Sequence, residues 1–201
     1  MIASLTLALA ILIQDPSATR MAGDRLLSAA QAGDVFENVS DGNAIRLKHP
    51  ASGMICQFDV AAQRNNIRVY PVRPEVANRG DDVGCGTTPD MGFTIYATRY
   101  SPTSTGETAM AQAIEEVEAI WSDVQRLDIP APAGAPDVRI AAFRARHPNG
   151  QSLSTVILIR QAGPWTFKMR ASGPPDQPGV LVQAAVERFT TQLPPSSSAA
   201  R

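Results

Sequence analysis

The sequence is poor in the residues that build metal and nucleophile sites, with two cysteines and two histidines among 201 residues. Zinc sites usually combine closely spaced Cys and His ligands, and this sequence has neither a Cys-x-x-Cys pair nor a Cys and a His at ligand spacing. It also lacks a Gly-x-Ser-x-Gly elbow, a His-Glu-x-x-His helix, a P-loop and a Gly-x-Gly-x-x-Gly turn. We therefore predict no metal, no cofactor and no recognisable catalytic residue.

An excess of charge of one sign is also missing. The chain has 18 Lys and Arg residues against 19 Asp and Glu residues, which gives a net charge of −1. No overall field would therefore concentrate nucleic acid or anionic lipid at its surface. Aromatic residues make up only 5% of the chain, so no stacking platform for carbohydrate or single-stranded nucleic acid is indicated. Nucleic acid is not predicted as a partner.

The sequence has no apolar run long enough to cross a membrane as a helix, and we predict no stable membrane span. The apolar run Ile2–Ile13 has the length of a signal-peptide core, and Pro16–Ala18 offers small residues for cleavage. We therefore predict a signal peptide over residues 1–18 and a periplasmic or secreted location. A buried N-terminal helix or strand is the alternative, since the run has no Lys or Arg before it.

The clearest structural signal is a hairpin over Ser152–Ala171. An unbroken apolar run, Thr155–Ile159, is followed by a break at Gly163–Pro164, after which large apolar side chains alternate with polar ones. The alternating apolar residues are Trp165, Phe167, Met169 and Ala171. Period-two alternation places these side chains on one face of a strand, so the segment is expected at the middle of a sheet.

Other strands are predicted where apolar and polar residues alternate between turn-forming residues. They cover Ile45–His49, Cys56–Val60, Ile67–Val72, Phe93–Arg99 and a strand that begins at Val138. Between the third and fourth of these, the segment Arg73–Asp90 is rich in Gly, Asp, Pro and Thr. That composition predicts a long surface loop.

Three helices are predicted. A short one lies near Leu26–Phe36, and the last covers Val180–Leu193. The middle one begins at a capping box formed by Ser104 and Glu107 and carries an apolar face at three- and four-residue spacing. The residues of that face are Met110, Ile114, Val117, Trp121 and Val124.

Runs of strands separated by helices predict an α+β fold rather than a parallel sheet. We expect a single α+β domain over residues 24–193, with an antiparallel sheet of about six to seven strands flanked by helices, and a disordered tail over residues 194–201. Two segments, Ile45–Val60 and Phe143–Ile159, each contain a basic strand end, a His-Pro turn and an apolar strand. They indicate either two duplicated α-βββ units or the common preference of turns for Pro, Asn and Gly.

Cys56 and Cys85 are the only cysteines, and a chain that enters an oxidising compartment is expected to pair them. A bridge would pin the Gly-rich segment Asp81–Gly86 to the strand that carries Cys56. Two free structural thiols, or a reactive Cys85 between its two flanking glycines, are the alternatives. We predict the disulfide, because no activating partner for Cys85 is visible in the sequence.

Short segments of the chain resemble small exported proteins of unknown function from Gram-negative bacteria. The segments are Gly53–Phe58, Arg79–Gly86 and Tyr96–Tyr100. The order of elements from Ile45 to Leu193 is similar to the PsbP-like α/β/α sandwich, although the Cys pair departs from it. This resemblance implies an accessory or binding factor rather than an enzyme.

We therefore predict a periplasmic, non-enzymatic binding or accessory domain whose partner is an envelope protein or a small ligand. The expected interaction surface is the segment Arg73–Thr105, with Arg79, Asp81 and Tyr100 as its exposed residues. The alternative is a hydrolase or other envelope enzyme with an unrecognised active site. His49 and His147 would be its candidate bases, although each precedes a proline in a predicted turn and needs no such role.

Overall fold

The computed structural model describes residues 16–42, 44–59, 64–87, 92–130 and 135–195. The signal peptide predicted over residues 1–18 and the tail predicted over residues 194–201 fall largely outside these ranges, so both remain predictions. The first helix begins at Pro16, before the expected start of the domain at residue 24. In the described ranges no helix has the length and apolar content needed to cross a membrane.

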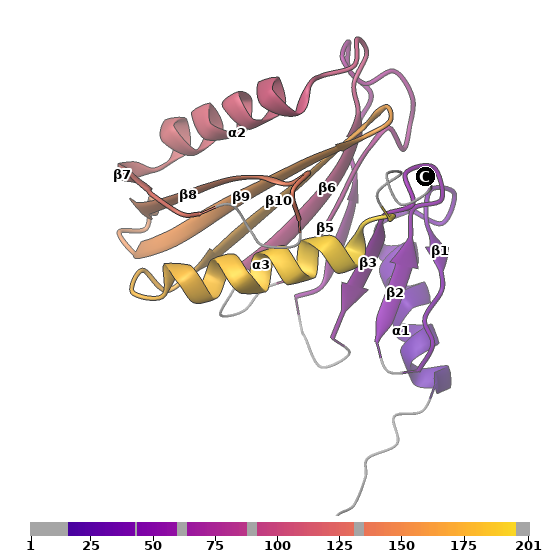
Figure 1. Cartoon of the computed structure of the whole chain (residues 1–201). Coiled ribbons are helices and arrows are strands. Elements are labelled where there is room, and N and C mark those ends of the chain that lie inside the picture. Colours follow the sequence, from indigo (N-terminus) through magenta and orange to yellow (C-terminus); the bar gives the residue numbers. More distant parts are fainter. Residues whose placement is uncertain (1–15, 43, 60–63, 88–91, 131–134, 196–201) are drawn as a thin grey trace, which may run out of the picture.

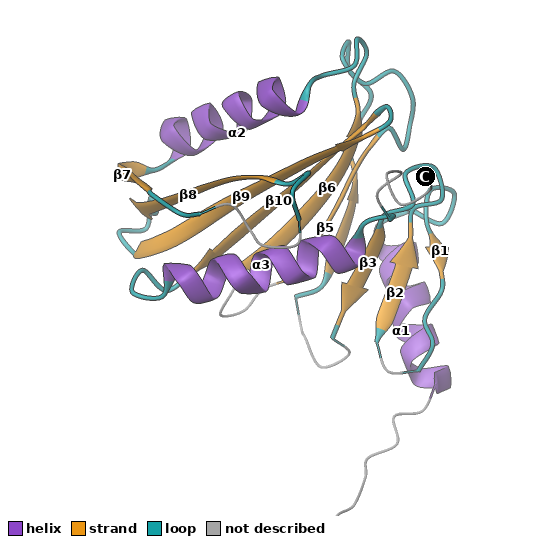
Figure 2. Ribbon diagram, viewed as in Figure 1, coloured by secondary structure: helices purple, strands orange, loops and turns teal. Residues whose placement is uncertain are grey.

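The described chain forms two antiparallel sheets and three helices (Figures 1 and 2). The small sheet has the order β1 (Glu37–Asn38), β2 (Ile45–Lys48) and β3 (Ile55–Phe58). The main sheet has the order β4 (Asn66–Val69), β5 (Asp82–Thr87), β6 (Gly92–Arg99), β10 (Trp165–Gly173), β9 (Ser152–Ala162), β8 (Arg139–Arg146) and β7 (Ser122–Leu127). The helices are α1 (Pro16–Ala29), α2 (Gly106–Ile120) and α3 (Pro178–Gln192). The predicted α+β class, with helices flanking an antiparallel sheet, is confirmed.

Helix α2 lies on one face of the main sheet, and α3 lies on the other together with the small sheet (Figure 1). The hairpin β9–β10 is central in this arrangement, because β9 is covered on both faces. Val156 and Leu158 belong to the large core beneath α3, whereas Ile157 and Ile159 belong to a smaller core beneath α2. Burial on both faces explains why the apolar run of β9 is unbroken, while β10 alternates.

The Gly-rich segment is a buried strand and not the surface loop predicted over Arg73–Asp90, because Asp82–Thr87 forms β5 within the main sheet. Val83 and Cys85 point into the large core. Gly84 lies on the opposite face, where a Cβ atom would be 3.0 Å from the ring of Tyr96. Glycine is needed there for the close approach, although its low strand propensity hides the strand from sequence analysis.

The start of α2 also differs from the prediction. Thr105 is the N-cap, and its side chain accepts a hydrogen bond from the backbone N–H of Thr108, so the capping box of Ser104 and Glu107 is wrong by one residue. The helix ends at Ile120. Trp121 and Val124 follow it, yet both still pack against the smaller core with the helical residues Met110 and Ile114.

The described part of the chain does not divide into two α-βββ units. Within it, six strands lie between α1 and α2, and four lie between α2 and α3. The two His-Pro turns lie in different sheets, since one joins β2 to β3 and the other joins β8 to β9. Each turn contains a glycine at positive φ, 76° for Gly53 and 87° for Gly150. Their likeness is therefore that of turns with similar backbone requirements.

Cys56 and Cys85 lie at disulfide-bonding distance, with their Sγ atoms 2.16 Å and their Cα atoms 6.0 Å apart. Cys56 is on β3 of the small sheet and Cys85 is on β5 of the main sheet. A bond here would link the two sheets through the large core, to which both residues belong.

We expect thiol titration of the denatured, unreduced protein to find no free thiol. Reduction of the wild-type protein should lower the free energy of unfolding by about 3 to 4 kcal/mol, because the bond closes a loop across 29 residues. Equilibrium denaturation with and without reductant measures the loss. The double variant Cys56→Ala, Cys85→Ala is the control, and its stability should not respond to reductant. Two titratable thiols before reduction would contradict the bond.

Candidate functional site

Helix α2 covers only part of its face of the main sheet. It packs on β7, β8 and β9, and beyond it the polar side chains of β5, β6 and β10 face a cavity of about 840 Å³. We call this cavity the tyrosine groove. Its lining residues from the strands and the segments that follow them include Tyr70, Arg73, Glu75, Asp82, Tyr96, Thr98, Tyr100, Lys168 and Arg170, and those from α2 are Thr108, Gln112 and Glu116. The groove thus lies between α2 and the uncovered part of the sheet.

The groove brings together all three tyrosines of the chain, Tyr70, Tyr96 and Tyr100. Tyr70 directly follows β4, Tyr96 lies on β6, and Tyr100 directly follows β6. The rings of Tyr70 and Tyr96 have their centroids 6.2 Å apart. Of the three, sequence analysis singled out only Tyr100. The other two could have been found from strand alternation, had the pairing of β4, β5 and β6 been known.

Two cations and one carboxylate meet at the α2 side of the groove. The Lys168 ammonium and the Arg170 guanidinium lie 3.1 and 3.4 Å from the same oxygen, Oε2 of Glu116. Lys168 also lies over the ring of Tyr96, with Nζ 5.1 Å from the ring centroid. Because Lys168 and Arg170 are two residues apart on β10, strand alternation directs both side chains to the same face.

A second ion pair lies on the other side of the groove. Arg73 contacts the carboxylate of Asp82 at 2.6 Å and lies 3.9 Å from that of Glu75. The hydroxyl of Thr98 donates to the other oxygen of Asp82 at 2.8 Å. Asp82 is buried, and Arg73 and Thr98 each contact one of its two carboxylate oxygens.

The hydroxyl groups of the groove remain hydrogen-bond donors at neutral pH. Burial raises the pKa of Tyr96, and burial together with the nearby Asp82 carboxylate raises that of Tyr100. The described lining contains no His or Cys, and the described part of the chain holds no cluster of side chains able to bind a metal ion. The arrangement is suited to recognising a polar ligand by charge and hydrogen bonds.

The three residues expected to form an interaction loop lie in different surroundings. Arg79 is exposed and pairs with Asp34, Nε to Oδ2, at 2.8 Å. Asp81 is buried and pairs with Arg99 at 2.6 Å. Tyr100 alone lines the groove. The three do not form one surface, because Asp81 is buried and neither it nor Arg79 lines the groove.

The two candidate histidines lie in different surroundings. His49 is 1% exposed, its Nδ1 is 2.8 Å from the hydroxyl of Ser52, and its ring contacts those of Phe36 and Trp165 with centroids 5.3 Å away in each case. Burial lowers the pKa of His49 to about 4, although the nearby Asp81 carboxylate opposes the shift. His49 and Ser52 are both buried, so a substrate in solution cannot reach them in this structure.

His147 is exposed and lies beside Trp121, with the ring centroids 6.3 Å apart. Its Nδ1 accepts a hydrogen bond from the backbone N–H of Asn149 at 3.3 Å within the β8–β9 turn. Neither histidine lines the tyrosine groove.

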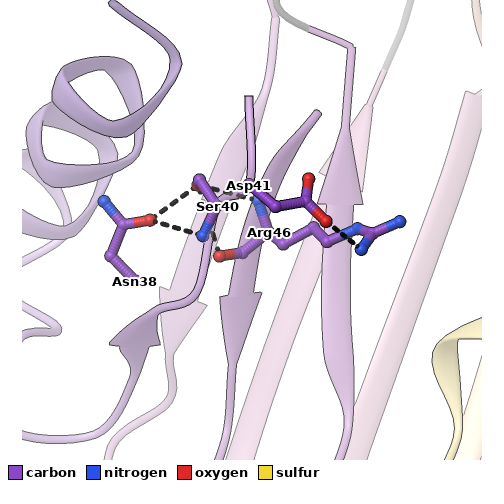
Figure 3. Close-up of polar contacts among 4 residues, drawn as sticks. All are labelled: Asn38, Ser40, Asp41 and Arg46. Carbon is purple, nitrogen blue, oxygen red and sulfur yellow. Dashed lines mark hydrogen bonds and ion pairs between the residues drawn. The ribbon is translucent and has the colours of Figure 1, made fainter. Parts of the chain in front are cut away.

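Another polar cluster ties the small sheet together (Figure 3). The side-chain oxygen of Asn38 accepts hydrogen bonds from the backbone N–H and the hydroxyl of Ser40, and Arg46 pairs with Asp41. The amide nitrogen of Asn38 donates to the carbonyl of Arg20 in α1 at 2.8 Å. These contacts fasten β1 to β2 and α1, so we assign the cluster a structural role.

The buried, neutral His49 predicts a loss of stability in acid. Between pH 6.5 and pH 4 the unfolded chain binds a proton at this residue that the folded chain does not, so the free energy of unfolding falls as pH is lowered through this window. The expected contribution is about 3 kcal/mol. Urea denaturation across the window, followed by the fluorescence of Trp165 and Trp121, measures it.

The variant His49→Gln should lose this part of the pH dependence, because its side chain does not titrate. The variant His147→Gln should retain it, since His147 is exposed. Equal pH slopes in the wild type and in His49→Gln would show that His49 is not the responsible group.

No family model matches the sequence, and no curated protein matches it. A search of solved structures finds a likeness to a Pseudomonas aeruginosa protein of unknown function described as a putative regulator. The likeness covers 78% of this chain and 100% of that one, with 11% sequence identity and a TM-score of 0.43. At this level it carries no argument about function.

Proposed function

We propose that the protein is a non-enzymatic binding domain of the bacterial envelope and that its ligand is a small polar molecule held in the tyrosine groove. One observation carries the proposal: a cavity of about 840 Å³ gathers all three tyrosines and two groups of ion-paired side chains. Small-molecule sites commonly enclose 300–1,000 Å³ and place a few polar groups around the ligand.

The contacts of two carboxylates in the groove favour binding over catalysis. Asp82 is engaged by Arg73 and Thr98, and Glu116 is engaged by Lys168 and Arg170. The described lining sets no His or Cys beside them that could act as a base or nucleophile. These carboxylates instead orient cations and hydroxyl groups around the cavity.

A location outside the cytoplasm is proposed on two grounds. The apolar run Ile2–Ile13 has the length of a signal-peptide core. Cys56 and Cys85 lie at disulfide-bonding distance, and disulfides persist mainly in oxidising compartments.

The ligand site can be tested by filling the groove from α2. Gln112 is exposed and lines the cavity, so Gln112→Trp should obstruct it without disturbing either core. Ala111 is exposed on the same helix but does not line the cavity, and Ala111→Trp is the matched control. Circular dichroism and thermal unfolding should show that both variants fold like the wild type.

Full-length wild-type protein and Ala111→Trp, exposed to a small-molecule extract of the bacterial envelope and then desalted, should retain the same compounds by native mass spectrometry. Gln112→Trp should lose most of this material. Retention of the same compounds by Gln112→Trp, or of none by the wild type, would contradict the groove as a ligand site.

Export can be tested by expressing the complete chain in a Gram-negative host. The accumulated protein should be found in the periplasmic fraction, with a mass lower by roughly the first 18 residues. Cleavage after Ala18 would make Thr19 the new N-terminal residue, and its hydroxyl donates to the carbonyl of Gly42 at 3.1 Å. An intact Met1 in the accumulated product would contradict export by a cleaved signal.

A further inference from the structure

We infer that the ligand of the tyrosine groove presents one carboxylate group to Lys168 and Arg170, beside Glu116. The inference rests on the proposed function, because it takes the groove as the ligand site. It adds the chemical class of the ligand, a small organic acid, and the two residues that select it.

Lys168 and Arg170 are fixed in position by the middle of the sheet. They lie on β10, where Lys168 is paired with Tyr96 on β6 and with Ile159 on β9. Arg170 is paired with Thr94 and Ile157 on the same two strands. Their side chains are only 23% and 25% exposed. Both cations are therefore held at the floor of the groove rather than on a mobile rim.

The charges at this point do not balance. Lys168 and Arg170 carry two positive charges, and both contact the same oxygen of the single carboxylate Glu116. The other two carboxylates of the groove, Asp82 and Glu75, both lie by Arg73 on its opposite side, so the groove is balanced as a whole and the surplus of positive charge is confined to the α2 side. One positive charge beside Glu116 is left for a ligand to neutralise, in partly buried surroundings where Coulomb attraction exceeds that in bulk water.

A group with a single negative charge matches this surplus. A carboxylate carries one negative charge and accepts hydrogen bonds from both an ammonium and a guanidinium. The hydroxyl of Tyr96 lies on the same face of the sheet and lines the same cavity. A phosphate group carries between one and two negative charges at neutral pH and would leave an excess of negative charge beside Glu116.

The test uses full-length protein and three probes that share a phenyl ring: phenylacetate, phenyl phosphate and 2-phenylethanol. Titration calorimetry at low ionic strength should show phenylacetate binding at least about tenfold more tightly than the uncharged alcohol. Added sodium chloride should weaken the binding of phenylacetate but not that of 2-phenylethanol. This comparison needs no variant, so it holds even if a substitution in the sheet impairs folding.

Substitution of either cation should weaken the binding of phenylacetate, whereas substitution of Glu116 should favour phenyl phosphate. Lys168→Gln and Arg170→Gln should each weaken phenylacetate binding by about tenfold, because each removes a charge-assisted hydrogen bond. Glu116→Gln releases a second positive charge and should shift the preference towards phenyl phosphate by about tenfold. Arg126→Gln, an exposed position on β7 outside the groove, should leave all three affinities unchanged.

The inference is overturned if phenylacetate binds no more tightly than 2-phenylethanol, if neither binds, or if Lys168→Gln and Arg170→Gln leave the affinity for phenylacetate intact. It is also overturned if the compounds that the wild type retains from the envelope extract, and that Gln112→Trp loses, carry no acidic group. That last outcome would leave the groove as a ligand site, whereas retention by Gln112→Trp would remove the proposed function itself.

Discussion

Every face of a sheet must be covered by apolar packing or carry polar side chains, and here the main sheet is wider than the one helix that covers its outer face. Helix α2 packs on β7, β8 and β9. On those strands the residues beneath it are apolar, as Phe143 and Ile159 show. On the uncovered strands the same face carries Lys168, Arg170 and Tyr96. The boundary between these two halves is the tyrosine groove, so the site follows from incomplete coverage of the sheet.

On the opposite face the small sheet extends the cover that α3 provides. One continuous core joins Phe58 of the small sheet, Met169 of the main sheet and Phe189 of α3. The junction contains the buried His49 and the close pair Cys56 and Cys85. These polar and sulfur-containing groups lie where two sheets meet, and their contacts account for them without a catalytic role.

Arginine side chains on the two faces illustrate how burial changes the role of a charge. Arg160 is 5% exposed on the inner face, where it donates to the carbonyl of Pro194 and lies over the ring of Phe167. It fastens the end of α3 to the sheet. Arg170 lies on the outer face with solvent access and shares its carboxylate partner with Lys168. Only the second arrangement leaves charge available to a ligand.

Much of the fold was predictable because it depends on local periodicity. The hairpin over Ser152–Ala171, the apolar face of the middle helix and the α+β class all follow from the spacing of apolar residues. The prediction failed at β5, where Gly84 and Gly86 have low strand propensity but leave space for Tyr96 and Thr94 on the neighbouring strand. Such glycines are understood only when the adjacent strand is known.

The predicted interaction segment Arg73–Thr105 supplies much of the groove lining, but the parts contributed by Tyr70, α2 and β10 were not predictable, because they come from segments that are far apart in the sequence. In the sequence, Lys168 and Arg170 are only the polar half of an alternating strand. Strand order places β10 beside β6, and the packing of α2 brings Glu116 to both cations. The sequence by itself determined which strands are amphipathic and where the middle and last helices lie, since these depend on neighbouring residues, whereas α1 covers Pro16–Ala29 and not the predicted Leu26–Phe36. Only the tertiary structure decided which polar side chains share a cavity, because strand pairing and helix placement depend on contacts between distant segments.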